Sequence, residues 1–216
     1  MLVVLLALLI TQPVGAQQAT GSTDSEALGK SWDGAYLNPD FNLEPNAFLV
    51  AVTKDLKPGD ALDVGMGQGR NAIFLAGQGW NVTGFDVSQV GVTQARERAQ
   101  ASQLKLNALR QTAADFDWGT NRWDLIVVMY FPGLRPYLQQ ITRSLKPGGV
   151  VVVEAYHADA TLDKPPGPGA GVRFESNELL TLFAPFRILR YEDIRARADW
   201  GMYDTRIVRL LARKRE

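Results

Sequence analysis

The chain has 216 residues, 46% of them hydrophobic and 21% charged, which is typical of a globular protein that buries one sizeable core. Its 23 basic and 23 acidic side chains cancel, so no long-range field attracts nucleic acid or an anionic membrane surface, and neither is expected as a partner. Cysteine is absent and His157 is the single histidine, which excludes disulfides, thiolate metal sites and cysteine nucleophiles and leaves little for zinc coordination. We therefore expect no metal site.

The first 16 residues have the pattern of an export signal. Residues 2–10 are all apolar, and the small residues at 14–16 precede an expected cleavage site after Ala16. The apolar run is too short to cross a bilayer, which takes roughly 20 residues, so no stable membrane span is expected after cleavage. No lysine or arginine precedes the run, so a wrongly assigned start is the alternative. Cleavage predicts a periplasmic or secreted protein, and retention predicts a cytoplasmic or membrane-anchored one.

Residues 17–31 are small and polar and predict a flexible linker. Residues 32–216 then form one domain, with a monomer as the default expectation. Trp32, Tyr36 and Phe41, at the start of this domain, suit either a lid over a ligand or ordinary core packing.

Strands and helices alternate along the domain. The apolar spacing and the boundary residues predict helices over 44–56, from 70 to 76, from an N-cap at Ser88 to about 103, and over 134–145, and strands over 61–64, 80–85, 106–111, 123–130 and 150–153. Parallel strands need crossover helices, so this order predicts an α/β fold with a doubly wound, mostly parallel, Rossmann-like sheet.

The end of the chain departs from this alternation. Ser176 is a candidate N-cap for a helix over 176–183, and two further strands are predicted over 187–191 and 205–213. The short connection between these strands favours an antiparallel hairpin at the sheet edge, which completes a seven-stranded sheet.

A glycine-rich turn follows the first predicted strand. Gly65, Gly67 and Gly69 alternate there, and Asp86 stands at the end of the second strand. A turn without side chains at this place lets a ligand approach the backbone. A carboxylate at the end of the second strand can accept hydrogen bonds from both hydroxyls of a ribose. The pattern predicts a ligand that contains a nucleoside.

Two residues distinguish between nucleoside ligands. Arg70 stands where the dinucleotide fingerprint has its third glycine, and Asp63, within the first strand, would repel a pyrophosphate but suit an ammonium group. S-adenosylmethionine carries a nucleoside and an ammonium group and no phosphate, so it fits both acids. An NAD(P)-dependent oxidoreductase and a non-catalytic cofactor-binding module stay open as alternatives.

The segment ALDVGMGQGRNAIFLAGQGWNVTGFDVS resembles the cofactor-binding core of class I S-adenosylmethionine-dependent methyltransferases. NLEPNAFLV before it and LKPGGVVVVEAY after it are similar to the small-molecule branch that includes tellurite-resistance-type methyltransferases. The resemblance runs from about Trp32 to Arg213. It is specific for the superfamily and weak for the substrate.

The resemblance implies a role for each matching residue. The methionine part of the cofactor lies against Asp63 and the glycine turn, and the ribose lies against Asp86. The remaining implied cofactor contacts are Val87 beside the adenine, Asp115 and Phe116 at the adenine amino group and ring, and Met129 beside the methyl donor. Met66 stands where the family often has cysteine or alanine.

The transfer itself requires little acid–base chemistry. An in-line displacement needs the nucleophile held about 3 to 3.5 Å from the methyl group with water excluded, and an anionic thiol or metalloid oxyanion needs no base. For a hydroxyl or amine acceptor, His157 or Tyr130 is the candidate base or orienting group. Arg173 is the candidate for steering an anionic acceptor, and Trp200 could gate the pocket. Each of these could equally be a packed or solvated residue.

Overall fold

The computed structural model of the protein describes residues 20–37, 42–161 and 173–216. The predicted export signal at 1–16 and the candidate lid residue Phe41 lie outside these ranges, so neither is tested. In chain order the elements are α1 (Thr20–Tyr36), α2 (Ala47–Thr53), β1 (Asp60–Val64), α3 (Arg70–Gly77), β2 (Asn81–Asp86), α4 (Gln89–Ala101), β3 (Leu106–Arg110), β4 (Trp123–Met129), η1 (Arg135–Tyr137), α5 (Leu138–Ser144), β5 (Leu145–Tyr156), α6 (Glu178–Leu182), β6 (Arg187–Ala198) and β7 (Tyr203–Arg213).

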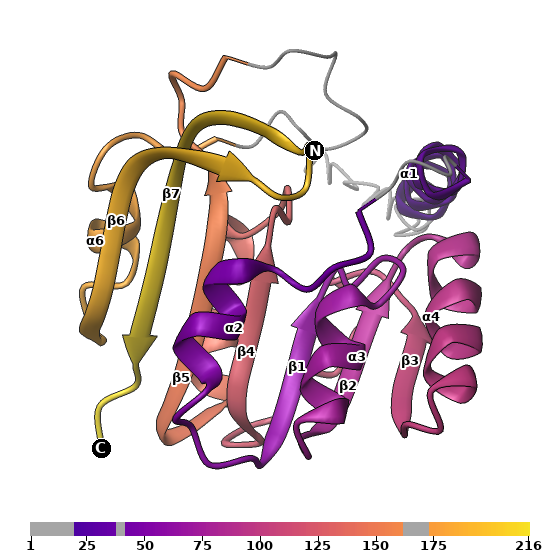
Figure 1. Ribbon diagram of the computed structural model, residues 1–216, viewed down its shortest axis with the longest axis horizontal. Helices are drawn as coiled ribbons and strands as arrows, with labels where there is room; N and C mark the ends of the chain where they lie inside the picture. The colour runs from indigo at the N-terminus through magenta and orange to yellow at the C-terminus, as the bar shows by residue number, and fades with distance from the viewer. Residues whose placement is uncertain (1–19, 38–41, 162–172) are drawn as a thin grey trace, which may run out of the picture.

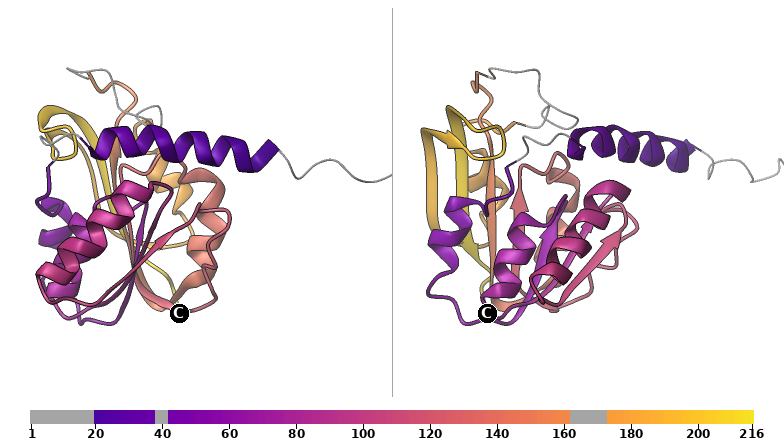
Figure 2. Two further views of the ribbon diagram at one scale, coloured as in Figure 1. Left: turned by 90° about the vertical axis from the view of Figure 1, so that its right-hand side faces the viewer. Right: turned by 45° about the vertical axis from the view of Figure 1, so that its right-hand side comes forward.

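The strands form one seven-stranded sheet in the order β3-β2-β1-β4-β5-β7-β6. The first five strands are mutually parallel, whereas β7 runs antiparallel to both β5 and β6. Helices α2, α3 and α4 cover one face, and α5 and α6 cover the other (Figures 1 and 2). The predicted doubly wound sheet with a C-terminal antiparallel hairpin is therefore confirmed.

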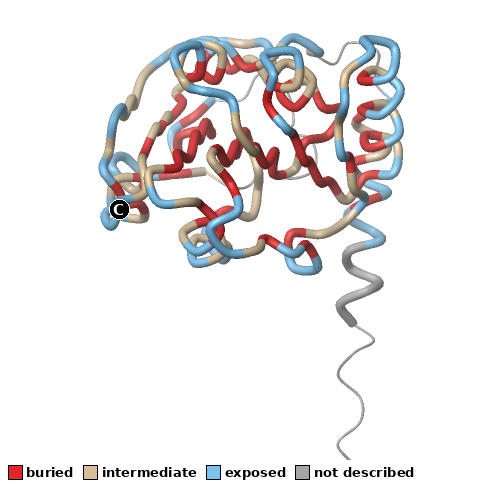
Figure 3. Tube along the Cα trace, turned by 90° about the horizontal axis from the view of Figure 1, so that it is seen from below, coloured by how far each residue is buried: buried red, intermediate tan, exposed pale blue. Residues whose placement is uncertain are grey.

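The core is divided between the two faces of the sheet. One large cluster packs Val82, Val127 and Val152 against Leu49 of α2 and Leu75 of α3. The other contains the side chains that the strands direct to the opposite face, packed with residues of α5 and α6. The buried segments of the tube in Figure 3 follow the strands through the middle of the molecule. A central parallel sheet buried on both faces needs the continuous apolar runs that β4 and β5 carry.

Of three helix starts, one agrees with the sequence prediction and two differ because other side chains provide the cap or find other partners. Helix α2 begins after Asn46, whose side chain accepts from the amide of Leu49 at 2.9 Å. Ser88 caps α4 as predicted, accepting from the amide of Gly91 at 2.9 Å. Ser176 does not cap α6: its hydroxyl donates instead to the Asp193 carboxylate at 2.7 Å.

Helix α1 occupies most of the segment that was predicted to be a flexible linker. Gly29, Trp32 and Tyr36 are buried, and their spacing places them on one face of this helix. The small and polar residues around them hide this periodicity in the sequence. In both views of Figure 2, α1 lies across the end of the sheet to which the parallel strands point. No helix in the described ranges is long and apolar enough to cross a membrane.

Candidate cofactor-binding site

The turn after β1 is shaped by three left-handed glycines. Gly65, Gly67 and Gly69 have φ angles of 65°, 54° and 74°, a region that side chains other than glycine rarely adopt. A Cβ atom on Gly65 would lie 2.7 Å from the Phe131 ring, and one on Gly67 would lie 2.5 Å from the Tyr36 hydroxyl. Both the conformation and the space therefore require glycine at the first two positions.

Asp86 lies at the end of β2, between the glycine turn and the start of α4. One oxygen accepts from the amide of Gly67 at 2.9 Å and the other from the amide of Ser88 at 2.8 Å. Burial raises the pKa of this carboxyl to about 6, although the amide hydrogen bonds act in the opposite direction. Each oxygen of a carboxylate has further acceptor capacity, so Asp86 can also accept from a diol.

Asp63, near the end of β1, carries an unsatisfied oxygen. Its side chain is buried, and its Oδ2 atom has no hydrogen-bond partner. Burial raises the pKa of this carboxyl to about 7, and the nearby Arg70 guanidinium limits the rise. A buried polar atom without a partner costs free energy, so Asp63 is suited to a ligand that brings a cation or a hydrogen-bond donor.

A cavity of about 880 Å³ opens beside these acids at the ends of the strands. This volume is toward the upper end of the range of small-molecule sites. A smaller adjoining hollow of about 40 Å³ includes Asp63 and Gly67 in its wall. The main cavity is lined by Leu28, Trp32, Tyr36, Gly65, Phe85, Asp86, Val87, Gln111, Thr112, Ala113, Ala114, Asp115, Met129, Tyr130, Phe131, Pro132, Gly133, Tyr137 and Trp200.

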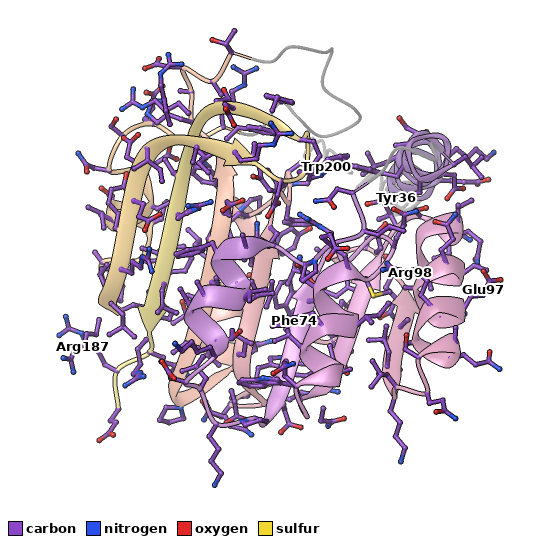
Figure 4. All side chains as sticks on the ribbon, viewed as in Figure 1. Tyr36, Phe74, Glu97, Arg98, Arg187 and Trp200 are labelled. Carbon is purple, nitrogen blue, oxygen red and sulfur yellow. The ribbon has the colours of Figure 1, made fainter. Side chains whose placement is uncertain are left out.

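Aromatic side chains from the two ends of the domain close the cavity. Trp32 and Tyr36 of α1 stack with ring centroids 5.7 Å apart, and Trp200, in the turn between β6 and β7, lies 6.0 Å from Trp32. Figure 4 shows Tyr36 and Trp200 near each other at the same end of the sheet. We call Trp32, Tyr36 and Trp200 the aromatic roof.

Polar contacts fix the α1 side of this roof. The Asp33 carboxylate of α1 accepts from the Ser88 hydroxyl at 2.5 Å and from the amide of Val90 at 3.0 Å, at the start of α4. Burial opposes ionisation of Asp33, but these hydrogen bonds outweigh it and hold the pKa below its ordinary value. The helix that covers the cavity is therefore anchored two residues from Asp86.

A nearly buried ion pair fixes the hairpin side of the roof. Arg70, at the start of α3, donates to the Asp199 carboxylate at 2.9 Å, and Asp199 also accepts from the amide of Ala47 at 3.0 Å. Since Asp199 directly precedes Trp200, this pair holds the tryptophan over the cavity. Arg70 thus stands where the dinucleotide fingerprint has its third glycine, and its side chain stabilises the aromatic roof instead.

Known proteins match both the central sequence and the fold. Residues 61–149 match the family model described as a methyltransferase domain. A ubiquinone biosynthesis O-methyltransferase of Rickettsia conorii is 27% identical over 106 residues, which cover 47% of this chain and 36% of that protein. The chain therefore spans well under half of this curated relative. Residues 61–149 therefore carry the sequence of a methyltransferase domain.

Solved structures share the fold of this methyltransferase domain over most of its length. TehB from Haemophilus influenzae has a TM-score of 0.67 and 20% identity, and the match covers 87% of this chain and 67% of TehB. A 1,6-didemethyltoxoflavin-N1-methyltransferase from Burkholderia thailandensis, solved with S-adenosylhomocysteine, has a TM-score of 0.69 and 20% identity, covering 96% of this chain and 94% of that one. At these identities the likeness concerns the fold.

S-adenosylmethionine fits the residues that the methyltransferase domain presents. The unpartnered Asp63 oxygen suits an ammonium group, Asp86 suits a ribose diol, and the glycine turn admits a ligand close to the backbone. Val87, Asp115 and Met129 line the main cavity, as the resemblance implied. Asp115 is exposed and accepts from the Thr112 hydroxyl at 2.7 Å, so its carboxylate is held at the cavity wall.

Phe116 is not among the residues that line the cavity. Its ring stacks on Phe85 at 4.5 Å and packs edge-on against Trp118 at 5.9 Å. Phe85 itself lines the cavity, so Phe116 supports the wall from beneath. The contact of Phe116 with the adenine ring stays a prediction, and the residues after β3 that line the cavity include Gln111, Thr112, Ala113 and Ala114.

Tyr130 lines the cavity but is unsuited to act as a base. Its hydroxyl donates to the buried Glu154 carboxylate at 2.6 Å, and Glu154 also accepts from Asn46 at 2.7 Å and pairs with Arg209. Burial and the neighbouring Glu154 raise the pKa of Tyr130 well above its ordinary value. Tyr130 is therefore protonated at neutral pH and acts as a hydrogen-bond donor that positions the wall.

His157 and Arg173 lie outside the described lining of the cavity. The Nδ1 atom of His157 accepts from the amide of Asp159 at 2.9 Å, and its Nε2 atom contacts the Ser176 hydroxyl at 3.1 Å. Arg173 donates to the carbonyls of Ala158 and Ala160. Local backbone groups and Ser176 engage these side chains, which join the segment after β5 to the segment before α6. The catalytic roles of His157 and Arg173 stay predictions.

Sequence reasoning missed three residues that shape the site. Each of them acts through partners that are distant in the sequence. Asp33 contacts the start of α4, and Glu154 contacts the start of α2 and strand β7. Asp199 contacts the starts of α2 and α3. One available signal was the acid at position 33 between two aromatic residues at helical spacing.

Proposed function

We propose that the protein is an enzyme that transfers a methyl group from S-adenosylmethionine to a small-molecule acceptor. The observation that carries this proposal is the pair of buried carboxylates, Asp63 and Asp86, at the edge of a roofed cavity of about 880 Å³. The names of the matched relatives specify an O-methyltransferase and an N1-methyltransferase, so oxygen and nitrogen are candidate acceptor atoms for this chain.

Bound S-adenosylmethionine supplies a methyl group on a cationic sulfur, which is already a strong electrophile. The side chains of this protein would hold the donor through Asp63 and Asp86 and exclude water with the aromatic roof. Positioning and desolvation supply most of the rate in such a displacement. Tyr130 is unsuited as a general base, since its hydroxyl donates to Glu154 and its pKa is raised.

Calorimetry with the purified protein tests the donor assignment. We expect S-adenosylmethionine and S-adenosylhomocysteine to bind and NADH not to bind. Preference for NADH would contradict the proposal and favour an oxidoreductase. Single-turnover assays with labelled methyl donor and thiol, selenite, tellurite, phenol and ring-nitrogen acceptors then test catalysis, and donor binding without transfer to any of them would favour a non-catalytic module.

The cellular location is a separate proposal that depends on residues 1–16. Cleavage after Ala16 would place the enzyme outside the cytosol, whereas its donor is made inside the cytosol. N-terminal sequencing of the protein from cell fractions tests both the cleavage and the location.

A further inference from the structure

The charged groups that line the main cavity are both acidic. Among the described lining residues, Asp86 and Asp115 are the only charged side chains, and neither lysine, arginine nor histidine contributes to the wall. An anionic acceptor would meet a described wall that contains two carboxylates and no cationic side chain, so the only cation near it would be the sulfonium of the donor. The wall therefore disfavours oxyanions and carboxylates.

The arginines nearest to this wall are engaged with other groups. Arg70 pairs with Asp199, and Arg135, which follows the lining residue Gly133, pairs with Glu178 at 2.7 Å. The guanidinium of Arg110 donates to a backbone carbonyl. Moving one of them into the cavity would break a contact that the fold uses, so they are poor anchors for an anionic acceptor.

Aromatic rings make up much of the rest of the cavity lining, namely those of Trp32, Tyr36, Phe85, Tyr130, Phe131, Tyr137 and Trp200. The Trp32 and Trp200 rings are tilted by 48° at 6.0 Å and form one continuous wall. Phe131 and Tyr137, also in the cavity lining, pack with ring centroids 6.3 Å apart. Rings favour planar partners through offset stacking and edge-to-face contacts.

We propose that the methyl acceptor is an uncharged, planar aromatic molecule, which lies against the aromatic roof and is methylated on a ring hydroxyl or ring nitrogen. This proposal rests on the methyltransferase function proposed above. In the reaction the bond between sulfur and methyl breaks, and its electron pair stays on sulfur to give S-adenosylhomocysteine. The acceptor lone pair forms the new bond to carbon, and any hydroxyl or ring N–H proton leaves to solvent.

A pair of probes that differ only in charge tests this inference. Catechol and 3,4-dihydroxybenzoate share the ring and both hydroxyls, and the second adds a carboxylate. We measure the dissociation constant of each for the protein saturated with S-adenosylhomocysteine. Catechol should bind at least tenfold more tightly. Equal or tighter binding of 3,4-dihydroxybenzoate, binding of neither probe, or transfer of methyl to tellurite or selenite would each overturn the aromatic assignment.

Variants of Trp200 identify the surface that the acceptor contacts. Trp200→Ala should weaken catechol binding at least fivefold, whereas Trp200→Phe, which keeps a ring, should stay within about twofold of the parent. Arg197→Ala, at an exposed position of the same hairpin, is the matched control and should leave both probes unaffected. Loss of catechol binding that is equal in Trp200→Phe and Trp200→Ala would contradict stacking.

The affinity for S-adenosylhomocysteine separates this inference from the proposed function. We expect it to be unchanged within about twofold in Arg197→Ala, an exposed residue outside the cavity lining. If the parent protein does not bind S-adenosylhomocysteine, the methyltransferase proposal itself fails. If it binds S-adenosylhomocysteine and rejects catechol, only the acceptor class is wrong.

Discussion

The floor and the roof of the cavity are built in opposite ways. The floor comes from one contiguous stretch, in which β1, the glycine turn and β2 present Asp63 and Asp86 side by side. The roof comes from α1 and from the turn between β6 and β7, which lie at opposite ends of the domain in the sequence. Backbone geometry specifies the floor, whereas distant side-chain contacts specify the roof.

This difference assigns different tasks to the two regions. The floor uses buried carboxylates that stay poorly compensated until a ligand arrives, which gives it chemical selectivity for a diol and a cation. The roof uses rings and is anchored by Asp33 and Asp199, which makes it suited to enclose a ligand and to select its shape. Changes in the floor should therefore affect donor affinity most, and changes in the roof should affect enclosure.

The largest effect is expected from the ribose-facing acid. Asp86→Ala removes a charged acceptor for two hydroxyls and should weaken binding of S-adenosylhomocysteine about a hundredfold or more in calorimetry, since a hydrogen bond to a charged group contributes roughly 1.5 to 3 kcal/mol. Asp117→Ala, an exposed acid outside the cavity, is the control. Unchanged affinity in Asp86→Ala would falsify the ribose assignment.

Donor affinity should also fall at low pH, because both floor acids have raised pKa values, about 7 for Asp63 and about 6 for Asp86. If the donor binds the ionised forms, its dissociation constant should rise at least about tenfold between pH 8 and pH 6. Asp63→Asn should bind more weakly at pH 8 and show less than about a threefold change over the same range. A parent protein whose affinity is flat across this range would contradict the role of Asp63.

The raised pKa values of Asp63 and Asp86 also predict that the protein without a ligand is less stable at higher pH. A carboxyl whose pKa is raised by folding favours the folded state while it is protonated, and this contribution is lost as the pH rises through the folded pKa. The melting temperature of the free protein should therefore decline between pH 5 and pH 8 more in the parent than in Asp63→Asn. Scanning calorimetry at both pH values checks this, and a steeper decline in the variant would reverse the assignment.

A smaller effect is expected at the anchor of α1. Asp33→Ala removes the acceptor for Ser88 and Val90 and should cost about 1 kcal/mol, comparable with the loss of a helix cap. If α1 closes over the bound donor, the affinity should fall by about fivefold. Glu26→Ala, which breaks the exposed Glu26–Lys30 pair on the same helix, should leave the affinity unchanged. Equal effects of both variants would argue against a specific role for the anchor.

The smallest effect on turnover is expected at Tyr130. Tyr130→Phe removes the hydroxyl that donates to Glu154, while Asn46 and Arg209 still satisfy that carboxylate. We expect about 1 kcal/mol of lost stability and less than about a threefold change in kcat, since a phenol with a raised pKa is not the base. A decrease in kcat of a hundredfold or more with unchanged donor affinity would restore Tyr130 as a catalytic group.

Chain periodicity was sufficient to predict the sheet, because buried parallel strands and amphipathic helices follow short-range rules. The floor acids were predictable for the same reason, since each stands at a fixed place relative to a strand end. The roles proposed for His157 and Arg173 depended on where side chains at a strand end and in a loop point. That direction is set by partners such as Ser176, which no local pattern reveals.

By itself the sequence determined the α/β fold, the glycine turn and the pair of acids around it. These features depend on backbone conformation and on residues that are close in the sequence, since a single helix and a single strand separate Asp63 from Asp86. Only the tertiary structure decided that α1 is a helix over the cavity, that Phe116 lies beneath the wall and that the wall contains no described cation. These features depend on long-range packing and on which buried polar groups find partners. The free energies of these contacts are defined only once the chain is folded.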